Sequence, residues 1–311
     1  MFSIVIPNWN GIRLNLLPTC LNGLRAQTYR DFETLVVDDC STDDSRDFIA
    51  REYPDMRVIT NEKNLGFAPS VNVGIRAAHG DVIVLLNNDT EADAHWLEEI
   101  ARALDANPKA GMLACKLRLF DQRTHLHSAG DFYRVDGIPG NRGVWEEDCG
   151  QYDHLANVFG ACGGAVAYRK TMLDEIGGFD EALGSYCEDV DLNWRARLAG
   201  YGIAYAPRAI VYHKISATAG GALASFFVGR NFIWVLAKNY PTSLWKKYWQ
   251  RIIGAQLQIT WDALKNIRGA AARARLRGQV AGLLGLRHWL KRRAEVIRRV
   301  SDEQIETVLM H

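Results

Sequence analysis

The sequence lacks the features that would mark a zinc-binding, redox-active or membrane-spanning protein. No two of its six cysteines stand in C-x-x-C spacing, which argues against a zinc knuckle or a redox pair and favours buried, free thiols in a reducing compartment. They are Cys20, Cys40, Cys115, Cys149, Cys162 and Cys187. No segment offers about 18 uninterrupted apolar residues, because the nearest candidate, 215–237, contains Arg230 and Asn231. We therefore expect no transmembrane span.

Signals for two classes of nucleotide enzyme are also missing. No G-x-G-x-x-G follows a predicted strand, so a dinucleotide-dependent oxidoreductase is disfavoured. The segment "PNWNGIRLN" lacks the long glycine-rich and basic phosphate loop of a sugar-nucleotide pyrophosphorylase. The chain opens directly on a predicted strand with no basic leader, so we expect no signal peptide and a cytoplasmic protein.

What the sequence does contain is an uneven distribution of charge behind a formal net charge of +1. Residues 242–311 carry 14 Lys and Arg against 5 Asp and Glu, which leaves 23 and 31 in residues 1–241. Tryptophans such as Trp245, Trp249 and Trp289 recur among the basic residues of this tail. The pattern predicts a basic amphipathic helical extension over 241–311 that lies in an anionic membrane interface, or else a helical pair packed on the rest of the protein. Nucleic acid is not expected as a partner, because no binding motif accompanies the charge.

The first 115 residues alternate between short runs rich in Val, Ile and Leu and stretches with helical periodicity. This alternation predicts an α/β fold with a mostly parallel sheet flanked by helices. The predicted strands are Ser3–Ile6, Thr34–Val37, Met56–Ile59, Val82–Leu86 and Gly111–Cys115, and the predicted helices are Leu14–Ala26, Asp43–Glu52, Ala68–His79 and Asp93–Asn107.

Four predicted strands run into polar segments, which are Pro7–Asn10, Val37–Asp44, Thr60–Ala68 and Leu86–Thr90. Ligands of parallel sheets bind beyond the carboxyl ends of the strands, so these ends predict a pocket. Asp39 is placed to accept hydrogen bonds from a base or ribose, whereas Ser41–Asp43 are explained as a helix cap. Asp89 is placed to hold Mg²⁺ or Mn²⁺ on a diphosphate. The competing interpretation of both acids is a structural role in a turn.

The second half of the chain is less regular. Lys116–Leu155 shows no clear period and predicts a long loop or a hairpin insertion. A glycine-rich turn, a strand and a short helix follow in 157–181, and Tyr186–Gly202 predicts an amphipathic helix. A last strand, Ile203–Tyr212, ends on His213, for which a metal or diphosphate contact and a purely structural role both remain open.

The helix that begins with "EDVD" carries two carboxylates with different predicted roles. Asp191 and Arg195 are four residues apart, so they form an ion pair on one face. Asp189 lies about 200° around the helix from Asp191, and in the first turn the helix dipole favours its ionised form. An ionised carboxylate facing a cleft is a competent general base. We therefore expect Asp189 to be the base, with Glu188 as the alternative.

Seven segments in this order resemble family 2 glycosyltransferases of the GT-A fold, and most of all their bacterial rhamnosyltransferase-like branch. They are "SIVIPNWNG", "VVDDCSTDDS", "NLGFAPSVNVGI", "LLNNDT", "FGACGGAVAYRK", "GGFDE" and "EDVDLNWRARLAGY". The resemblance covers roughly Phe2 to Lys238. It implies a GT-A domain over 1–240, with a nucleotide-binding half in 1–115 and an acceptor half in 116–240.

The resemblance implies inverting transfer of a sugar from a nucleotide-diphosphate donor to an acceptor hydroxyl, with Mg²⁺ or Mn²⁺ as cofactor. This sequence departs from the family's D-x-D motif, because Asn87 and Asn88 precede Asp89. Only one carboxylate remains there, which gives His213 more weight. By resemblance, Pro7, Trp9, Asp39, Asn64 and Asn88 bind the nucleotide sugar, Asp89 and His213 hold the metal, and Asp189, or Glu188 in its place, is the catalytic base.

The implied acceptor is a glycan or a lipid-linked glycan of cell-surface polysaccharide assembly, at the inner face of the cell membrane. The walls that select donor and acceptor are expected in Lys116–Phe159. An alternative of another class is a non-catalytic subunit that binds a nucleotide sugar or anchors a partner at the membrane. The reduced "NND" favours that alternative, whereas the intact Glu188–Asp189 pair argues against it. The sequence leaves the oligomeric state open.

Overall fold

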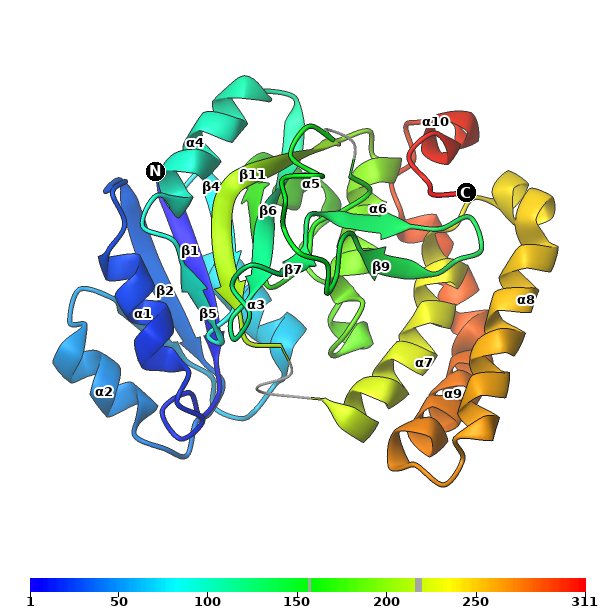
Figure 1. Ribbon diagram of the computed structural model, residues 1–311, viewed down its shortest axis with the longest axis horizontal. Coiled ribbons are helices and arrows are strands. Elements are labelled where there is room, and N and C mark those ends of the chain that lie inside the picture. The colour runs from blue at the N-terminus through cyan, green and yellow to red at the C-terminus, as the bar shows by residue number, and fades with distance from the viewer. Residues whose placement is uncertain (156–157, 216–219) are drawn as a thin grey trace.

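The computed structural model describes residues 1–155, 158–215 and 220–311 (Figure 1). A central sheet has helices on both faces, and three long helices, α7, α8 and α9, stand together beside it (Figure 1). The strands are β1 Phe2–Asn8, β2 Phe32–Asp38, β3 Arg57–Thr60, β4 Val82–Leu86, β5 Thr90–Ala92, β6 Ala110–Leu119, β7 Leu126–Ser128, β8 Asp131–Tyr133, β9 Pro139–Asn141, β10 Ala165–Arg169 and β11 Gly202–His213. The α-helices are α1 Leu17–Arg25, α2 Ser45–Glu52, α3 Phe67–Ala77, α4 Trp96–Ala106, α5 Lys170–Ile176, α6 Glu188–Leu198, α7 Gly221–Asn239, α8 Thr242–Lys265, α9 Ala270–Lys291 and α10 Asp302–Glu306, with short 3₁₀ turns at Glu181–Leu183 and Arg292–Glu295.

The sheet order is β3-β2-β1-β4-β10-β6-β11-β5, with β7 paired to β6. Strands β1 to β4 run parallel to one another, and β11 runs parallel to β6. Strand β10 lies antiparallel between β4 and β6, and β5 lies antiparallel to β11. The predicted α/β sheet flanked by helices is confirmed, with its β3-β2-β1-β4 part parallel and the pairings of β10, β5 and β7 antiparallel. The carboxyl ends of β1, β2 and β4 meet at one edge.

All five strands and four helices predicted for the first 115 residues are present, with ends shifted by a few residues. The segment 116–155 is more ordered than expected. Strand β6 continues to Leu119, β7 pairs with it, and β8 and β9 form the hairpin. Strands β7, β8 and β9 are three residues each, which is too short for a period of two to show in the sequence.

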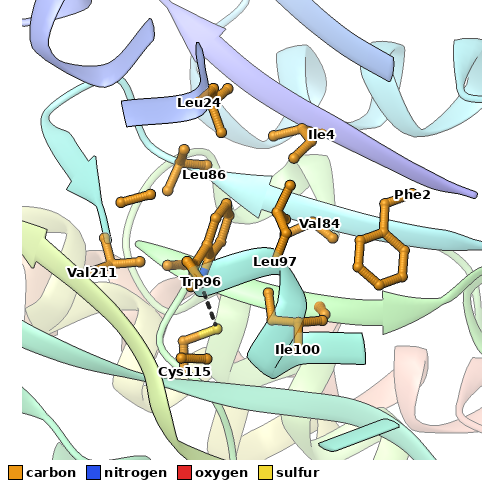
Figure 2. Packing of buried hydrophobic residues seen from close by; sticks show 14 of the residues in the cluster. Phe2, Ile4, Leu24, Val84, Leu86, Trp96, Leu97, Ile100, Cys115 and Val211 are labelled. Atoms are coloured by element: carbon orange, nitrogen blue, oxygen red, sulfur yellow. Dashed lines mark hydrogen bonds between the residues drawn. The ribbon is translucent and has the colours of Figure 1, made fainter. Parts of the chain in front are cut away.

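The core has two layers, one on each face of the sheet. Ile4 and Ile6 of β1 point into the layer under α1 and α4, whereas Val5 points into the layer under α3. In the first layer the indole N–H of Trp96 donates to Cys115 Sγ at 3.3 Å (Figure 2). The six cysteines are free, as predicted, but only Cys20, Cys115 and Cys187 are buried and Cys149 is exposed. Each fully buried Leu or Ile contributes about 1.5–3 kcal/mol to folding.

The C-terminal helices join the protein through α7. A Cβ atom on Gly278 of α9 would lie 2.1 Å from the carbonyl oxygen of Phe226 on α7, so glycine lets the two backbones meet. A third buried cluster combines residues on both sides of position 240, including Trp194, Leu244 and Trp289. The predicted domain boundary at 240 remains a prediction. Within the described ranges, no helix has the length and apolar character needed to cross a membrane.

Candidate active site

The polar ends of β1, β2 and β4 are joined by side-chain hydrogen bonds. The amide of Asn88 donates to Asn8 Oδ1 at 2.9 Å, and the amide of Asn8 donates to Asp38 Oδ1 at 3.1 Å. The backbone N–H of Ser41 donates to the second oxygen of Asp38 at 3.0 Å. The predicted nucleotide contact Asn88 is therefore buried in a network that fixes the strand ends.

Asp39 holds the loop between β3 and α3. Its carboxylate accepts hydrogen bonds from Asn61 Nδ2 at 2.9 Å and from the backbone N–H groups of Leu65 and Gly66 at 2.8 Å each. Asn64 is exposed on the same loop. A carboxylate has about four acceptor sites, so three bonds leave room for a base or ribose donor.

Pro7 and Trp9 complete the predicted nucleoside contacts at the end of β1. Pro7 is the next-to-last residue of the strand, and the Trp9 side chain just beyond it is 38% exposed. An exposed aromatic ring at the carboxyl edge of a parallel sheet is available to stack on a base.

The structure pairs Asp89 with His213 across neighbouring strands. Strand β11 pairs with β5 so that His213 lies opposite Thr90, the residue after Asp89. His213 Nε2 lies 3.2 Å from Asp89 Oδ1, and both side chains are about nine-tenths buried. The other ring nitrogen of His213, Nδ1, lies 2.9 Å from Nδ1 of His127 on β7.

Two glycines connect this pair to the predicted base. The backbone N–H of Gly163 donates to Asp189 Oδ2 at 2.9 Å. The next residue, Gly164, accepts a hydrogen bond from the N–H of Asn87 at 3.0 Å, and a Cβ atom on it would lie 3.1 Å from the His213 ring. Asp89 and Asp189 are therefore brought to the same edge of the sheet, on either side of the Gly163–Gly164 segment.

The start of α6 is built on an unusual turn. Tyr186 and Cys187 both adopt left-handed backbone conformations, with φ of 66° and 67°, which cost of order 1–3 kcal/mol each in non-glycine residues. Asn231 of α7 stabilises the turn, because its amide donates to the carbonyl oxygens of Leu183, Ser185 and Tyr186. The turn delivers Glu188 to the first helical position.

Burial changes the protonation of both carboxyls at this helix start. It raises the pKa of Asp189, even though the N–H groups of Gly163 and Val190 donate to its oxygens. Burial, and then the charge of Asp189, raises the pKa of Glu188 well above its usual range. The helix dipole expected to favour ionisation is thus outweighed by desolvation, which makes Asp189 a stronger base.

Asp191 has the structural role predicted for it. Its carboxylate lies 2.7 Å from Arg195 Nε, as expected for residues four apart, and also receives Lys238 Nζ at 2.9 Å and the Asn239 amide at 2.8 Å. Burial opposes the charge of Asp191, but Arg195 and Lys238 hold the pKa of this carboxyl below its usual range. The ion pair ties α6 to the end of α7.

Two residues near the site were not predicted from the sequence, and both come from Lys116–Leu155, for which a long loop or a hairpin insertion was expected. His127 contacts His213, and Asp131 lies close enough to Asp189 to feel its charge. Burial, and then Asp189, raises the pKa of Asp131 from 3.8 to about 7. The only signal in the sequence was the pair His125 and His127 in a segment without a readable period.

The residues present are compatible with a divalent cation at Asp89. Among the described residues, Asp89 Oδ1 is a buried oxygen with no hydrogen-bond donor in good geometry, and His213 Nε2 faces it. No group of three His, Cys, Asp or Glu residues with metal-ligand geometry occurs in the part of the chain that the structure describes. Two protein ligands suit Mg²⁺ or Mn²⁺, which usually keep several waters and bind substrate phosphates.

The sequence model of glycosyl transferase family 2 matches residues 3–177, which is more than half of the chain. The protein belongs to this family. Among curated relatives, an uncharacterized glycosyltransferase of Haemophilus influenzae is 31% identical over 61% of this chain and 60% of its own length. The O-antigen biosynthesis protein RfbC of Myxococcus xanthus is 28% identical over 70% of this chain but only 17% of its own length. An N-acetylglucosaminyl-diphospho-decaprenol L-rhamnosyltransferase of Mycobacterium tuberculosis is 26% identical over 64% of this chain and 72% of its own length.

Solved glycosyltransferases share the fold of this family 2 member. TarS of S. aureus in complex with UDP-GlcNAc superposes with a TM-score of 0.59 at 16% identity, over 99% of this chain and 92% of that one. The mannosyltransferase PcManGT of Pyrobaculum calidifontis, in complex with GDP-Man and Mn²⁺, gives a TM-score of 0.57 at 17% identity, over 95% and 84%. The predicted GT-A fold is confirmed.

Proposed function

We propose that this glycosyltransferase moves a hexosyl or deoxyhexosyl group from a nucleotide-diphosphate donor to an acceptor hydroxyl with inversion at the anomeric carbon. The observation that carries the proposal is the placement of Asp189 beside the Asp89–His213 pair, through the Gly163–Gly164 segment. Asp189 would then accept the proton of the attacking oxygen, and the Asp89–His213 pair would lie near the leaving diphosphate.

In this reaction Asp189 takes the proton of the acceptor hydroxyl while that oxygen forms a bond to the anomeric carbon. The bond from the anomeric carbon to the diphosphate oxygen breaks on the opposite face, and the nucleoside diphosphate leaves with the electron pair. Asp89 and His213 would hold a divalent cation, which would supply positive charge to stabilise the leaving diphosphate. Glu188, buried and adjacent, is the competing base.

The donor is proposed to lie along the carboxyl ends of β1, β2 and β4. Pro7, Trp9 and Asp39 would contact the nucleoside. Asn64 and Asn88 would contact other parts of the nucleotide sugar. The neighbours with this fold were solved with UDP-GlcNAc and with GDP-Man, so both nucleotide classes belong in a donor screen. The Mycobacterium relative is named for a lipid-diphosphate-linked sugar acceptor, and we propose an acceptor of that chemical class for cell-surface glycan assembly.

A donor screen followed by turnover measurements tests the proposal. We expect one nucleotide sugar to raise the melting temperature, because a ligand that binds only the folded state stabilises it. That donor should be hydrolysed slowly with Mn²⁺ and more slowly with EDTA. Early ¹H NMR spectra of the transferred product should show the anomeric configuration opposite to that of the donor. Donor binding without turnover under any condition would favour the non-catalytic alternative instead.

We also propose that the C-terminal helices place the enzyme on an anionic membrane surface. In α8 the row Leu244, Tyr248 and Ile252 is buried, whereas the adjacent row points to solvent. That exposed row consists of Trp245, Trp249, Ile253, Leu257 and Trp261, and α9 adds the exposed Val280, Leu283, Leu284 and Leu290. Exposed basic side chains surround these rows, namely Lys246, Lys247, Arg251, Lys265, Arg273, Arg277, Arg287 and Lys291.

Tryptophan and leucine flanked by Lys and Arg are the composition of helices that lie in a lipid interface, where cations contact anionic headgroups. The turn between α8 and α9 lies at the same lower end of the molecule as the carboxyl ends of β1 and β2 (Figure 1). The two interpretations of the tail are compatible: α9 packs on α7, and the exposed apolar row of α8 remains free for a membrane surface to cover.

Vesicle flotation tests this surface. The protein should float with vesicles containing anionic phosphatidylglycerol and float poorly with neutral phosphatidylcholine. The double variant Trp249→Ala/Trp261→Ala should lose about tenfold or more in partitioning, since each buried aromatic contributes on the order of 1 kcal/mol or more. Trp145→Ala is the matched control, because this tryptophan is 63% exposed but lies outside the tail. If the double variant floated as well as the wild type, α8 would not be part of the membrane-binding surface.

A further inference from the structure

His213 is held between His127 of β7 and Asp89 of the turn between β4 and β5. Its Nε2 faces Asp89 Oδ1 at 3.2 Å, and its Nδ1 contacts Nδ1 of His127 at 2.9 Å. The ring centroids of the two histidines are 4.8 Å apart. Gly164 lies against the His213 ring, where a Cβ atom would come within 3.1 Å.

The backbone of His127 is held in place by hydrogen bonds on both sides of β7. Strand β7 pairs with β6, with Ser128 opposite Leu117. On the other side of β7, the N–H of Leu126 donates to the carbonyl oxygen of Glu146 at 2.8 Å. The N–H of Trp145 donates to the carbonyl oxygen of Leu126 at 2.9 Å. His127 is therefore presented to His213 by a backbone that is hydrogen-bonded on both sides.

The contact between the two Nδ1 atoms needs one proton, because two lone pairs repel and two N–H groups clash. One ring therefore donates from Nδ1, and the ring that accepts there is neutral and carries its single proton on Nε2. A cation held by His213 requires a lone pair on Nε2. The proton of His213 then sits on Nδ1 and is donated to His127, whose own proton is on Nε2.

We propose that His127 is a positioning residue of the cation site, which accepts the Nδ1–H of His213 and thereby directs the Nε2 lone pair toward Asp89 and the donor diphosphate. A half-turn of the His213 ring would place carbon atoms against both His127 and Asp89, so the contact also selects one ring orientation. The inference rests on the proposed transferase function. Partners of this kind typically change metal affinity by 10–100-fold when they are removed.

The test measures Mn²⁺ binding rather than turnover alone. Mn²⁺ is titrated into the full chain with UDP or GDP, whichever raises its melting temperature, and free Mn²⁺ is read by electron paramagnetic resonance. His127→Phe keeps a ring of similar size without an acceptor, and we expect it to raise the Kd for Mn²⁺ by 10–100-fold. Nucleotide affinity in EDTA and the melting temperature should stay near wild type. His127→Asn retains an acceptor oxygen and should recover part of the affinity.

His125→Phe is the matched control, since His125 lies two residues earlier in the same segment and contacts Thr124 instead. It should bind Mn²⁺ like the wild type. If His127→Phe does not fold, His127→Asn and ¹⁵N-histidine spectra of the wild type with Mg²⁺ and the nucleotide decide the question. A proton on Nε2 of His213 in that complex overturns the proposal, as does wild-type Mn²⁺ affinity in the folded variants. Absence of Mn²⁺ binding by the wild type also overturns it, whereas donor turnover in EDTA would leave the transferase proposal standing.

Discussion

The acidic residues at the carboxyl edge of the sheet differ in how their oxygens are used. Asp38 and Asp39, which follow β2, accept hydrogen bonds from Asn8, Ser41, Asn61, Leu65 and Gly66. Glu188 at the start of α6 and Asp89 after β4 each have a buried oxygen without a donor among residues 1–155, 158–215 and 220–311. The first group fixes the loops that follow β1, β2 and β3. The second retains acceptor capacity, which is what a base or a cation ligand needs.

Asp189 differs from both groups, because its two oxygens accept the backbone N–H groups of Gly163 and Val190. The largest effect is expected at this residue, because it is the base proposed for the acceptor hydroxyl. Asp189→Asn should lower kcat by about 10³-fold, because general base catalysis contributes roughly 10²–10⁴-fold. The melting temperature should stay the same or rise, since burial disfavours the charge that is removed. Steady-state kinetics and calorimetry measure both quantities. Asp174→Asn, an exposed acid of α5, is the control, and equal activity of the two variants would exclude Asp189 as the base.

The opposite pattern is expected for Asp191, whose oxygens are fully used. Asp191→Ala removes the carboxylate that pairs with the buried Arg195 and one of the two that pair with Lys238, the other being Asp180. Removing one partner of a buried ion pair typically destabilises by about 3–5 kcal/mol. Urea unfolding measures the loss. Asp174→Ala breaks an exposed pair with Lys170 and should change stability by about 1 kcal/mol or less. Similar losses in the two variants would contradict the structural role of Asp191.

Asp39 should fall between these cases. Asp39→Ala removes the acceptor of the Leu65 and Gly66 N–H groups and one of the two acceptors of the Asn61 amide, which also donates to Ser70. We expect a loss of about 1–3 kcal/mol from these unpaired donors. Donor binding should weaken as the loop loosens, whereas kcat at saturating donor should change little. Isothermal titration and turnover at high donor concentration separate the two effects. A fall in kcat with unchanged stability would contradict this loop-holding role and indicate that Asp39 takes part in the chemical step.

The smallest predicted effect is a change in pH dependence. Because the pKa of Asp131 is about 7 in the folded protein and near 3.8 otherwise, its contribution to stability is complete below about pH 4 and is lost as the pH rises through about 7. Asp131→Asn keeps an acceptor for Ser128 and Asn141 but cannot ionise. Its melting temperature should therefore fall less than that of the wild type between about pH 5 and pH 8. Parallel curves would contradict the raised pKa.

The sequence predicted the strands and helices of residues 1–115 well because their signals are local. Runs such as Val82–Leu86 are buried on both faces, so strong apolar character and the polar residues that follow marked each strand and its end. The ion pair of Asp191 and Arg195 was predictable for the same reason, since helix geometry fixes residues four apart. A hairpin insertion was one of the two predictions for 116–155, but the positions of β7, β8 and β9 were not predictable, because each strand is only three residues long and is defined by its pairing.

By itself the sequence determined the α/β class, the family and the identity of the candidate acids, since all three are properties of ordered motifs along one chain. Only the tertiary structure decided which oxygens are already satisfied, that His127 reaches His213 from a segment 86 residues away, and that burial raises the pKa of Glu188 and Asp189. Those outcomes depend on desolvation and on contacts between distant segments, and neither is encoded in local spacing.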